Sequence, residues 1–241
     1  MVASLAASCF DVLGFCSPLV GQLRNSVSHI IKNSNKAGWE YLIPEEEWTF
    51  FLKVLMELYK TSQHTFPRHP PTQGDNLHGK ITLFVCSDAS ISLVVDAYLL
   101  IPQGDGSFKP NLITSKTYMG DPNRTLAVRE LEAESHASTL TNDMVHEYGA
   151  MLRNFYVGVD STIALFWTFK PDIRKKGILI ENRTNNIRQS LNQAYSYLVE
   201  QHKFQGLCSE MSRETPLDNS CLLYTSPSPR DQRGSRMPSS A

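Results

Sequence analysis

The spacing of hydrophobic and polar positions divides the chain into two parts. From Phe10 to Arg68 the apolar positions mostly follow a helical period, and the repeat is longest from Glu45 to Tyr59. Pro44 comes directly before this repeat, and because proline suits a helix start, we predict that a helix begins there. Residues 66–75 are rich in proline and polar side chains, which should neither continue a helix nor join a sheet. We therefore predict a domain boundary at this stretch.

Beyond this boundary the hydrophobic pattern becomes that of strands. Strands joined by hairpins are predicted at residues 80–86, 91–101 and 111–119, with a turn at 103–106. A helix, a short buried strand and a second helix are then predicted at residues 126–152, 155–159 and 161–169. The resulting order is β-β-β-α-β-α, in which the first three strands should be antiparallel because hairpins connect them.

Composition and charge narrow the class of protein. Of the 241 residues, 41% are hydrophobic and 20% are charged, which is typical of a globular chain with one good core and a small appendage. The formal net charge is −1, so any binding of nucleic acid needs a local basic face. The five cysteines form no C-x-x-C pair, which favours a reducing compartment. The apolar start lacks a basic region and is interrupted by Asp11, so it predicts neither a signal peptide nor a membrane span.

Three acidic residues lie in or directly after apolar stretches. Asp88 and Asp160 are predicted at the ends of the first and fourth strands, and Glu130 on the first helix of the second part. A carboxylate in such surroundings is costly unless something pairs with it, and converging carboxylates would form the oxygen-rich site that Mg²⁺ prefers. The residues alone leave other interpretations open. Asp160 could be a helix N-cap, and Glu130 could lie on a solvated face, as we expect for Glu132 and Glu134.

The motifs around these acids resemble those of one family. They are S-D-A-S at 87–90, E-L-x-A at 130–133 and D-S-T-x-x-L-x-W at 160–167. Residues 10–18 are similar to the F-D-P-L-G-x-x-S-P of the same family, 115–117 to its A-K-S strand, and 182–183 to an N-R pair in its helix. Over roughly residues 2–220 the chain resembles the Pol polyprotein of BEL/Pao-type LTR retrotransposons.

The resemblance implies an α/β fold, in which a ribonuclease H-like mixed sheet is flanked by helices and preceded by a small, mainly helical segment. Residues 1–68 would be a connection-like tail of the reverse transcriptase, 69–79 a linker and 80–220 the ribonuclease H-like domain. Residues 221–241 resemble the translation of a sequencing adaptor, so we expect them to be disordered and the natural chain to continue past Ser220.

The same resemblance implies metal-dependent, ribonuclease H-type cleavage of RNA in RNA–DNA hybrids, with two Mg²⁺ or Mn²⁺ ions as cofactors. The implied catalytic residues and metal ligands are Asp88, Glu130, Asp160 and Asp218. The implied contacts to nucleic acid are Lys116, Asn182 and Arg183. The expected partners are the hybrid and the remainder of the Pol polyprotein, with no membrane. The expected location is the cytoplasm, in a virus-like particle, or the nucleus, and not the secretory route.

Two alternatives stay open. The matching region of the family is also known as a Pao retrotransposon peptidase, which would make the chain an aspartic peptidase. Against this, such sites have the pattern Asp-Thr/Ser-Gly, and neither Asp88-Ala-Ser nor Asp160-Ser-Thr supplies the glycine. The second alternative is an inactive remnant, favoured by Val94 and Val95 where the family has small residues. No Tyr-x-Asp-Asp motif is present, so the chain cannot copy nucleic acid by itself.

Overall fold

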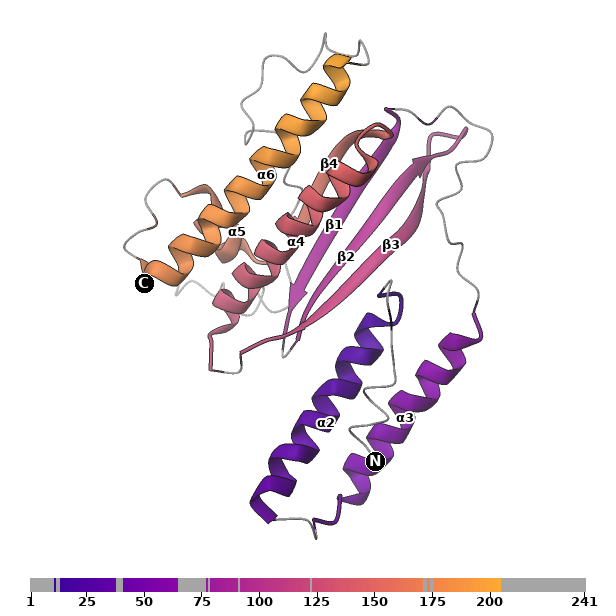
Figure 1. The fold of residues 1–241 in the computed structure, drawn as a ribbon, viewed down its shortest axis with the longest axis vertical. Coiled ribbons are helices and arrows are strands. Elements are labelled where there is room, and N and C mark those ends of the chain that lie inside the picture. The colour runs from indigo at the N-terminus through magenta and orange to yellow at the C-terminus, as the bar shows by residue number, and fades with distance from the viewer. Residues whose placement is uncertain are drawn as a thin grey trace, which may run out of the picture.

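The computed structural model describes residues 11, 14–37, 41–64, 77, 79–90, 92–121, 123–170, 173 and 176–204, which are arranged as shown in Figure 1. In chain order the elements are α2 Ser17–Ala37, α3 Glu45–Ser62, β1 Ile81–Ala89, β2 Ser92–Pro102, β3 Phe108–Met119, α4 Leu126–Tyr148, β4 Leu152–Val159, α5 Thr162–Phe169 and α6 Ile178–Phe204. A pair of helices thus precedes a sheet that is flanked by helices. The predicted α/β class is confirmed.

The strands form one mixed sheet in the order β3-β2-β1-β4. β1 pairs with β2 and β2 with β3 in antiparallel fashion, as the predicted hairpins require. β4 pairs with β1 in parallel, after the chain has returned through α4. Every second residue of β2 is buried, which is the period of a strand with one face on the core. β1 is buried or half-buried at every position except Asp88, and most of its sequence is correspondingly apolar.

The main core lies between the sheet and α4, and α6 packs on the outer side of α4 (Figure 1). Leu131 and Leu140 of α4 are buried with Val85 and Leu99 of the sheet. The buried residues of α6 recur at helical spacing, at Ile187, Leu191, Ala194 and Leu198. α4 is therefore covered on two sides, by the sheet and by α6, and few of its positions reach solvent.

α2 and α3 form a helical hairpin with a small core of its own, made by Leu23, Val27, Phe51 and Val54. α3 begins directly after Pro44, as predicted. The start of α2 packs on β3, where the Ser17 hydroxyl donates to Thr117 Oγ1 at 2.7 Å. Further along α2, Asn25 Nδ2 donates to Ser92 Oγ at 2.7 Å. These contacts join the helical hairpin to the strand ends at one end of the sheet.

Several element boundaries differ from the prediction: β1 continues to Ala89, past the predicted 86, and β3 begins at Phe108, before the predicted 111. The predicted helix to residue 152 ends at Tyr148, and β4 begins at Leu152, earlier than the predicted 155. A tight turn separates them, in which Met151 N donates to Tyr148 O at 2.8 Å. Leu152 is fully buried and pairs with Ile81, so sheet pairing at this residue outweighs the helical period of its neighbours. Residues 205–241, which include Asp218 and the adaptor-like segment, lie outside the described residues.

Candidate functional site

Asp88 and Asp160 come directly after the last residue pair that joins two parallel strands. This pair is Ser87 of β1 with Val159 of β4. β1 itself continues to Ala89, so Asp88 lies inside its strand, whereas Asp160 directly follows β4. Neighbouring strands are about 4.8 Å apart, so this register brings the two backbones close together. The predicted convergence of Asp88 and Asp160 at one sheet edge is therefore supported by the backbone register.

The two acids are held by different neighbours. Ser87 and Ala89 are buried on either side of the exposed Asp88, so alternation along β1 directs Asp88 to the face away from the core. Asp160 is half-buried and directly precedes Ser161, whose side chain accepts a hydrogen bond from Ala164 N at 3.2 Å. Ser161 is the N-cap of α5. The alternative interpretation of Asp160 as the N-cap is therefore wrong.

Glu130 lies on the first turns of α4, which pack against the turn between β1 and β2. Ala133, one helical turn after Glu130, is buried with Ala89 and Leu93. Arg129 Nη1 donates to the carbonyl oxygen of Ser90, two residues after Asp88. Glu130 therefore belongs to the same end of the sheet as the two aspartates, but it projects from the helix that covers the opposite face of β1.

A metal ion would find suitable donor chemistry here, because Asp88, Glu130 and Asp160 offer only carboxylate oxygens, the ligands that Mg²⁺ and Mn²⁺ prefer. In the described part of the chain, however, no three or more His, Cys, Asp or Glu side chains are gathered closely enough to hold a metal ion. The fourth predicted ligand, Asp218, lies outside that part. The type of donor fits Mg²⁺, and the assembly of the full ligand set stays a prediction.

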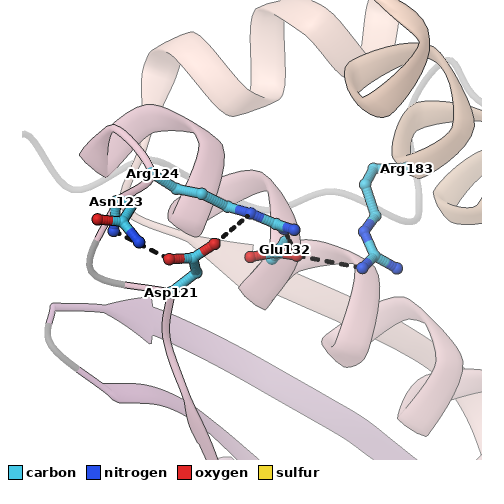
Figure 2. A network of polar contacts seen from close by, with 5 residues as sticks. All are labelled: Asp121, Asn123, Arg124, Glu132 and Arg183. Carbon is cyan, nitrogen blue, oxygen red and sulfur yellow. Dashed lines mark hydrogen bonds and ion pairs between the residues drawn. The ribbon is translucent and has the colours of Figure 1, made fainter.

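Glu132 is the centre of a polar network that joins three segments (Figure 2). Its side chain pairs with Arg124, from the loop before α4, and with Arg183 Nη2 of α6 at 3.1 Å. Asp121 extends the network, with Oδ2 at 3.4 Å from Arg124 Nε. The expectation that Glu132 lies on a solvated face is wrong: only 7% of it is exposed, because α6 and the loop cover this side of α4.

Glu134 is also buried, contrary to the same expectation, and none of it is exposed. Its Oε1 accepts a hydrogen bond from Thr168 Oγ1 of α5 at 2.9 Å, whereas Oε2 has no hydrogen-bond partner among the described residues. Burial raises the pKa of this carboxyl group to about 7, and the Thr168 hydroxyl partly opposes the shift. Arg188 Nε of α6 donates to the Thr168 carbonyl at 2.8 Å. The sequence alone did not predict this link between helices. α5 and α6 come later in the chain, and they bury a face of α4 that the local pattern of polar residues indicates as exposed.

The residues predicted to contact nucleic acid differ in how exposed their side chains are and in whether they already bond within the protein. Lys116 on β3 and Asn182 on α6 are exposed. Arg183 is partly buried and bonded to Glu132, so its role in the fold is established by geometry, and its contact with nucleic acid stays a prediction.

The ring of His136 stacks on Tyr118 at 3.9 Å between ring centres. Burial, then Arg183 and Lys116, lower the pKa of His136, while Glu132 opposes them, which indicates a net positive potential beside this ring.

A mixed sheet in the order β3-β2-β1-β4, with acids at the ends of its two parallel strands, defines a ribonuclease H-like protein. The family model described as "Pao retrotransposon-like RNaseH-like domain" matches residues 1–161, and the chain belongs to this family. A retrotransposon Pol origin and a general nucleic-acid-cleaving role of the ribonuclease H type follow from this membership.

The family match includes Asp88, Glu130 and Asp160, and it ends before Asn182, Arg183 and Asp218. The roles of all six residues stay predictions: the match covers the first three, the β1–β4 register supports only the closeness of Asp88 and Asp160, and the last three depend on local motifs. A search of the curated proteins finds no match. None of the helices in the described ranges combines the length and apolar character needed to cross a membrane.

Proposed function

We propose that the chain cleaves the RNA strand of RNA–DNA hybrids in a metal-dependent reaction, as part of a retrotransposon polyprotein. One observation carries the proposal: Asp88 and Asp160 each come one residue after the last pair between the parallel strands β1 and β4, within the part of the chain that matches a ribonuclease H-like family. Two carboxylates at neighbouring strand ends are a suitable base for a site that hydrolyses phosphodiesters.

In this proposal, Mg²⁺ or Mn²⁺ would be held by Asp88, Glu130, Asp160 and Asp218. When bound, the ions supply an activated water and stabilise the leaving oxygen. The chain's own residues position these ligands. Arg129 ties α4 to the β1–β2 turn through Ser90, and the Ser161 cap fixes the direction in which the chain leaves Asp160. Because Asp88 is exposed, a phosphodiester can approach it from solvent.

Recognition of the hybrid would depend on its shape. An A-like duplex presents a wide minor groove with 2′-hydroxyl groups and regularly spaced phosphates, and it is recognised with little sequence preference. Exposed groups such as Lys116 and Asn182 can contact this backbone. The net charge of −1 over the whole chain means that such contacts must be concentrated locally.

The test is an assay of the full chain on an end-labelled RNA–DNA hybrid with Mg²⁺ or Mn²⁺. Asp88→Asn keeps the size of the side chain and removes its charge, and we expect it to reduce cleavage at least about a hundredfold. Asp143→Asn, at an exposed position of α4, is the matched control and should cleave like the wild type. Equal cleavage by the wild type and Asp88→Asn would contradict the proposal.

Two parallel measurements address the alternatives. The chain would be a peptidase and not a nuclease if it cleaves casein, an aspartic peptidase inhibitor abolishes this cleavage, and the hybrid stays intact. No cleavage of either substrate by a folded chain would identify an inactive remnant. Loss of the RNA strand together with intact casein is the result that we expect.

A further inference from the structure

The short helix α5 begins directly beside the proposed cleavage site and lies against α4 and α6 (Figure 1). Asp160 comes directly before Ser161, which is the N-cap of α5. A shift or rotation of α5 would therefore change the direction in which the chain leaves Asp160. The position of this carboxylate next to Asp88 thus depends on what holds α5 in place.

Apolar packing holds α5 only weakly. Of its eight residues, Ala164 and Thr168 are buried. The other large apolar side chains are partly buried at the edge of the main core, at Leu165 and Trp167, or about half exposed, at Ile163 (51%), Phe166 (59%) and Phe169 (43%). Because stabilisation by apolar side chains scales with the surface that they bury, and because a helix this short is not stable by itself, polar contacts to neighbouring helices gain importance here.

Such contacts are found at the C-terminal end of α5. The Thr168 hydroxyl donates to Glu134 Oε1 of α4 at 2.9 Å. Arg188 of α6 donates from Nε to the Thr168 carbonyl at 2.8 Å, and from Nη2 to the Lys170 carbonyl. The last carbonyls of a helix have no partner within the helix, and a cation is favourable at this end of the helix dipole. Arg188 therefore caps α5, and Glu134 ties the same end to α4.

The bond between Thr168 and Glu134 is shielded from water. Thr168 is 1% exposed, and no part of Glu134 is exposed. Breaking a hydrogen bond at such a place is costly, because both groups would stay buried without a partner. Glu130 and Glu134 are four residues apart on α4, so they lie on one face of this helix. The network thus holds α5 against the face of α4 that also carries Glu130.

We propose that Glu134, Thr168 and Arg188 are positioning residues of the cleavage site, which hold α5 so that Asp160 keeps its place relative to Asp88 and Glu130. The inference rests on the proposed function and adds three groups that act through α5. Strand pairing positions Asp160 from the side of β4, and the network positions it from the side of α5. A displacement of about 1 Å in a catalytic group can reduce the rate by up to about a hundredfold.

Three variants of the full chain test the network. Thr168→Val removes the hydroxyl group and keeps the size of the side chain, whereas Thr168→Ser keeps the hydroxyl group. Thr141→Val is the matched control, because Thr141 is also buried and its hydroxyl donates within α4, to the Ala137 carbonyl at 2.8 Å. Both valine variants lose one buried hydrogen bond, but only Thr168→Val loses a bond between α5 and α4.

The first measurement needs neither metal nor substrate. Hydrogen–deuterium exchange followed by mass spectrometry reports how often the amides of residues 162–170 open to solvent. Thr168→Val should increase their exchange rate several-fold, because the end of α5 is no longer tied to α4. Thr168→Ser and Thr141→Val should exchange like the wild type in these residues.

The second measurement is cleavage of the labelled hybrid at a series of Mg²⁺ concentrations. Thr168→Val should lower kcat about tenfold and raise the Mg²⁺ concentration for half-maximal cleavage several-fold, because Asp160 is displaced. KM for the hybrid should stay unchanged, since the surface that contacts the substrate is intact. Thr168→Ser should recover most of the activity, and Thr141→Val should cleave like the wild type.

The outcomes separate this inference from the proposed function. If Thr168→Val behaves like Thr141→Val, or if exchange in α5 increases with no change in kcat, the positioning role is overturned, while cleavage that depends on Asp88 still supports the nuclease. If the wild-type chain leaves the hybrid intact, the proposed function fails and the positioning role fails with it. Should Thr168→Val not fold, Arg188→Gln compared with Arg153→Gln, at an exposed position of β4, decides the same question.

Discussion

At the scale of single residues, the environment of a side chain decides its chemistry more than its type does. Glu130, Glu132 and Glu134 follow one another at every second position of α4, yet they have different surroundings. Glu130 is half-buried near the strand ends, Glu132 is paired with two arginines, and Glu134 is fully buried beside a single hydroxyl. Burial raises the pKa of the Glu134 carboxyl group to about 7, so this group should couple folding to pH near neutrality.

The first prediction concerns the pH dependence of stability. Burial raises the pKa of Glu134 from its ordinary value of 4.5 to about 7 in the folded protein, so protonation of this carboxyl group stabilises the fold. This contribution is complete below about pH 4.5 and is lost as pH rises through 7. We expect Glu134→Gln, which stays neutral, to flatten the fall in unfolding free energy between pH 5 and pH 8 (roughly the window of the shift). Urea unfolding followed by tryptophan fluorescence measures this.

A matched variant controls for general effects of charge. Glu147→Gln changes an exposed glutamate of the same helix and should keep the pH dependence of the wild type. The same pH dependence in Glu134→Gln and in the wild type would show that Glu134 is ionised in the folded protein throughout this range.

At the scale of elements, a few polar contacts determine how helices and loops are joined. The ion pairs of Glu132 connect α4 with α6 and with the loop that leads out of β3 (Figure 2). Gly14 has a comparable role at the start of α2, where the backbone approaches β3. Its φ is +77°, and an added Cβ would lie 1.6 Å from the Ser115 carbonyl oxygen. Packing of the helical hairpin against the sheet therefore depends on the absence of a side chain at this position.

The second prediction is that Glu132→Ala destabilises the fold by about 1–3 kcal/mol, because it removes the buried carboxylate that pairs with both Arg124 and Arg183, while Arg124 keeps its pair with Asp121. Glu132→Gln should recover part of this loss, since an amide oxygen can still accept hydrogen bonds. Glu57→Ala, which removes the exposed pair with Lys60, should change stability by less than about 0.5 kcal/mol. Equal effects at Glu132 and Glu57 in urea unfolding would mean that the network contributes no more than a surface pair.

The third prediction is that Gly14→Ala weakens the contact between α2 and β3. The positive φ and the clash with Ser115 both oppose a side chain, and we expect a loss of at least about 2 kcal/mol or separate unfolding of the helical hairpin. Gly104→Ala is the control, because a Cβ at that position meets no atom within 4 Å. Limited proteolysis between α3 and β1, together with thermal unfolding, distinguishes the two effects. Identical behaviour of the two variants would contradict a close approach at Gly14.

At the scale of the whole molecule, chain segments that are distant in sequence meet at one end of the sheet (Figure 1). The ends of β1 and β4, the start of α4 and the packing face of α2 all lie there. The proposed cleavage site lies at this end, and the helical hairpin contacts the sheet there through Ser17 and Asn25. The Asp88→Asn variant tests the proposed site.

The sequence by itself determined the local order of the chain. The hydrophobic period predicts β1, β2, β3, α4 and α5 close to their true positions, most clearly for β2, where every second residue is buried. The motifs at 87–90, 130–133 and 160–167 indicated Asp88, Glu130 and Asp160; Asp160 follows β4 as predicted, and Asp88 lies one residue before the end of β1. The sequence analysis indicated α6 only by a short N-R motif, although Ile187, Leu191, Ala194 and Leu198 recur at helical spacing among its many polar residues.

Tertiary structure alone decided which polar groups are buried and what they contact. Nothing local shows that Glu132 and Glu134 face α6 and α5, since burial by a later helix depends on packing between segments that are 30 or more residues apart. The pairing of Val94 with both Asp88 and Thr117 likewise exists only in the assembled sheet. Local periods follow from backbone geometry, whereas partners follow from how the whole chain encloses its apolar surface.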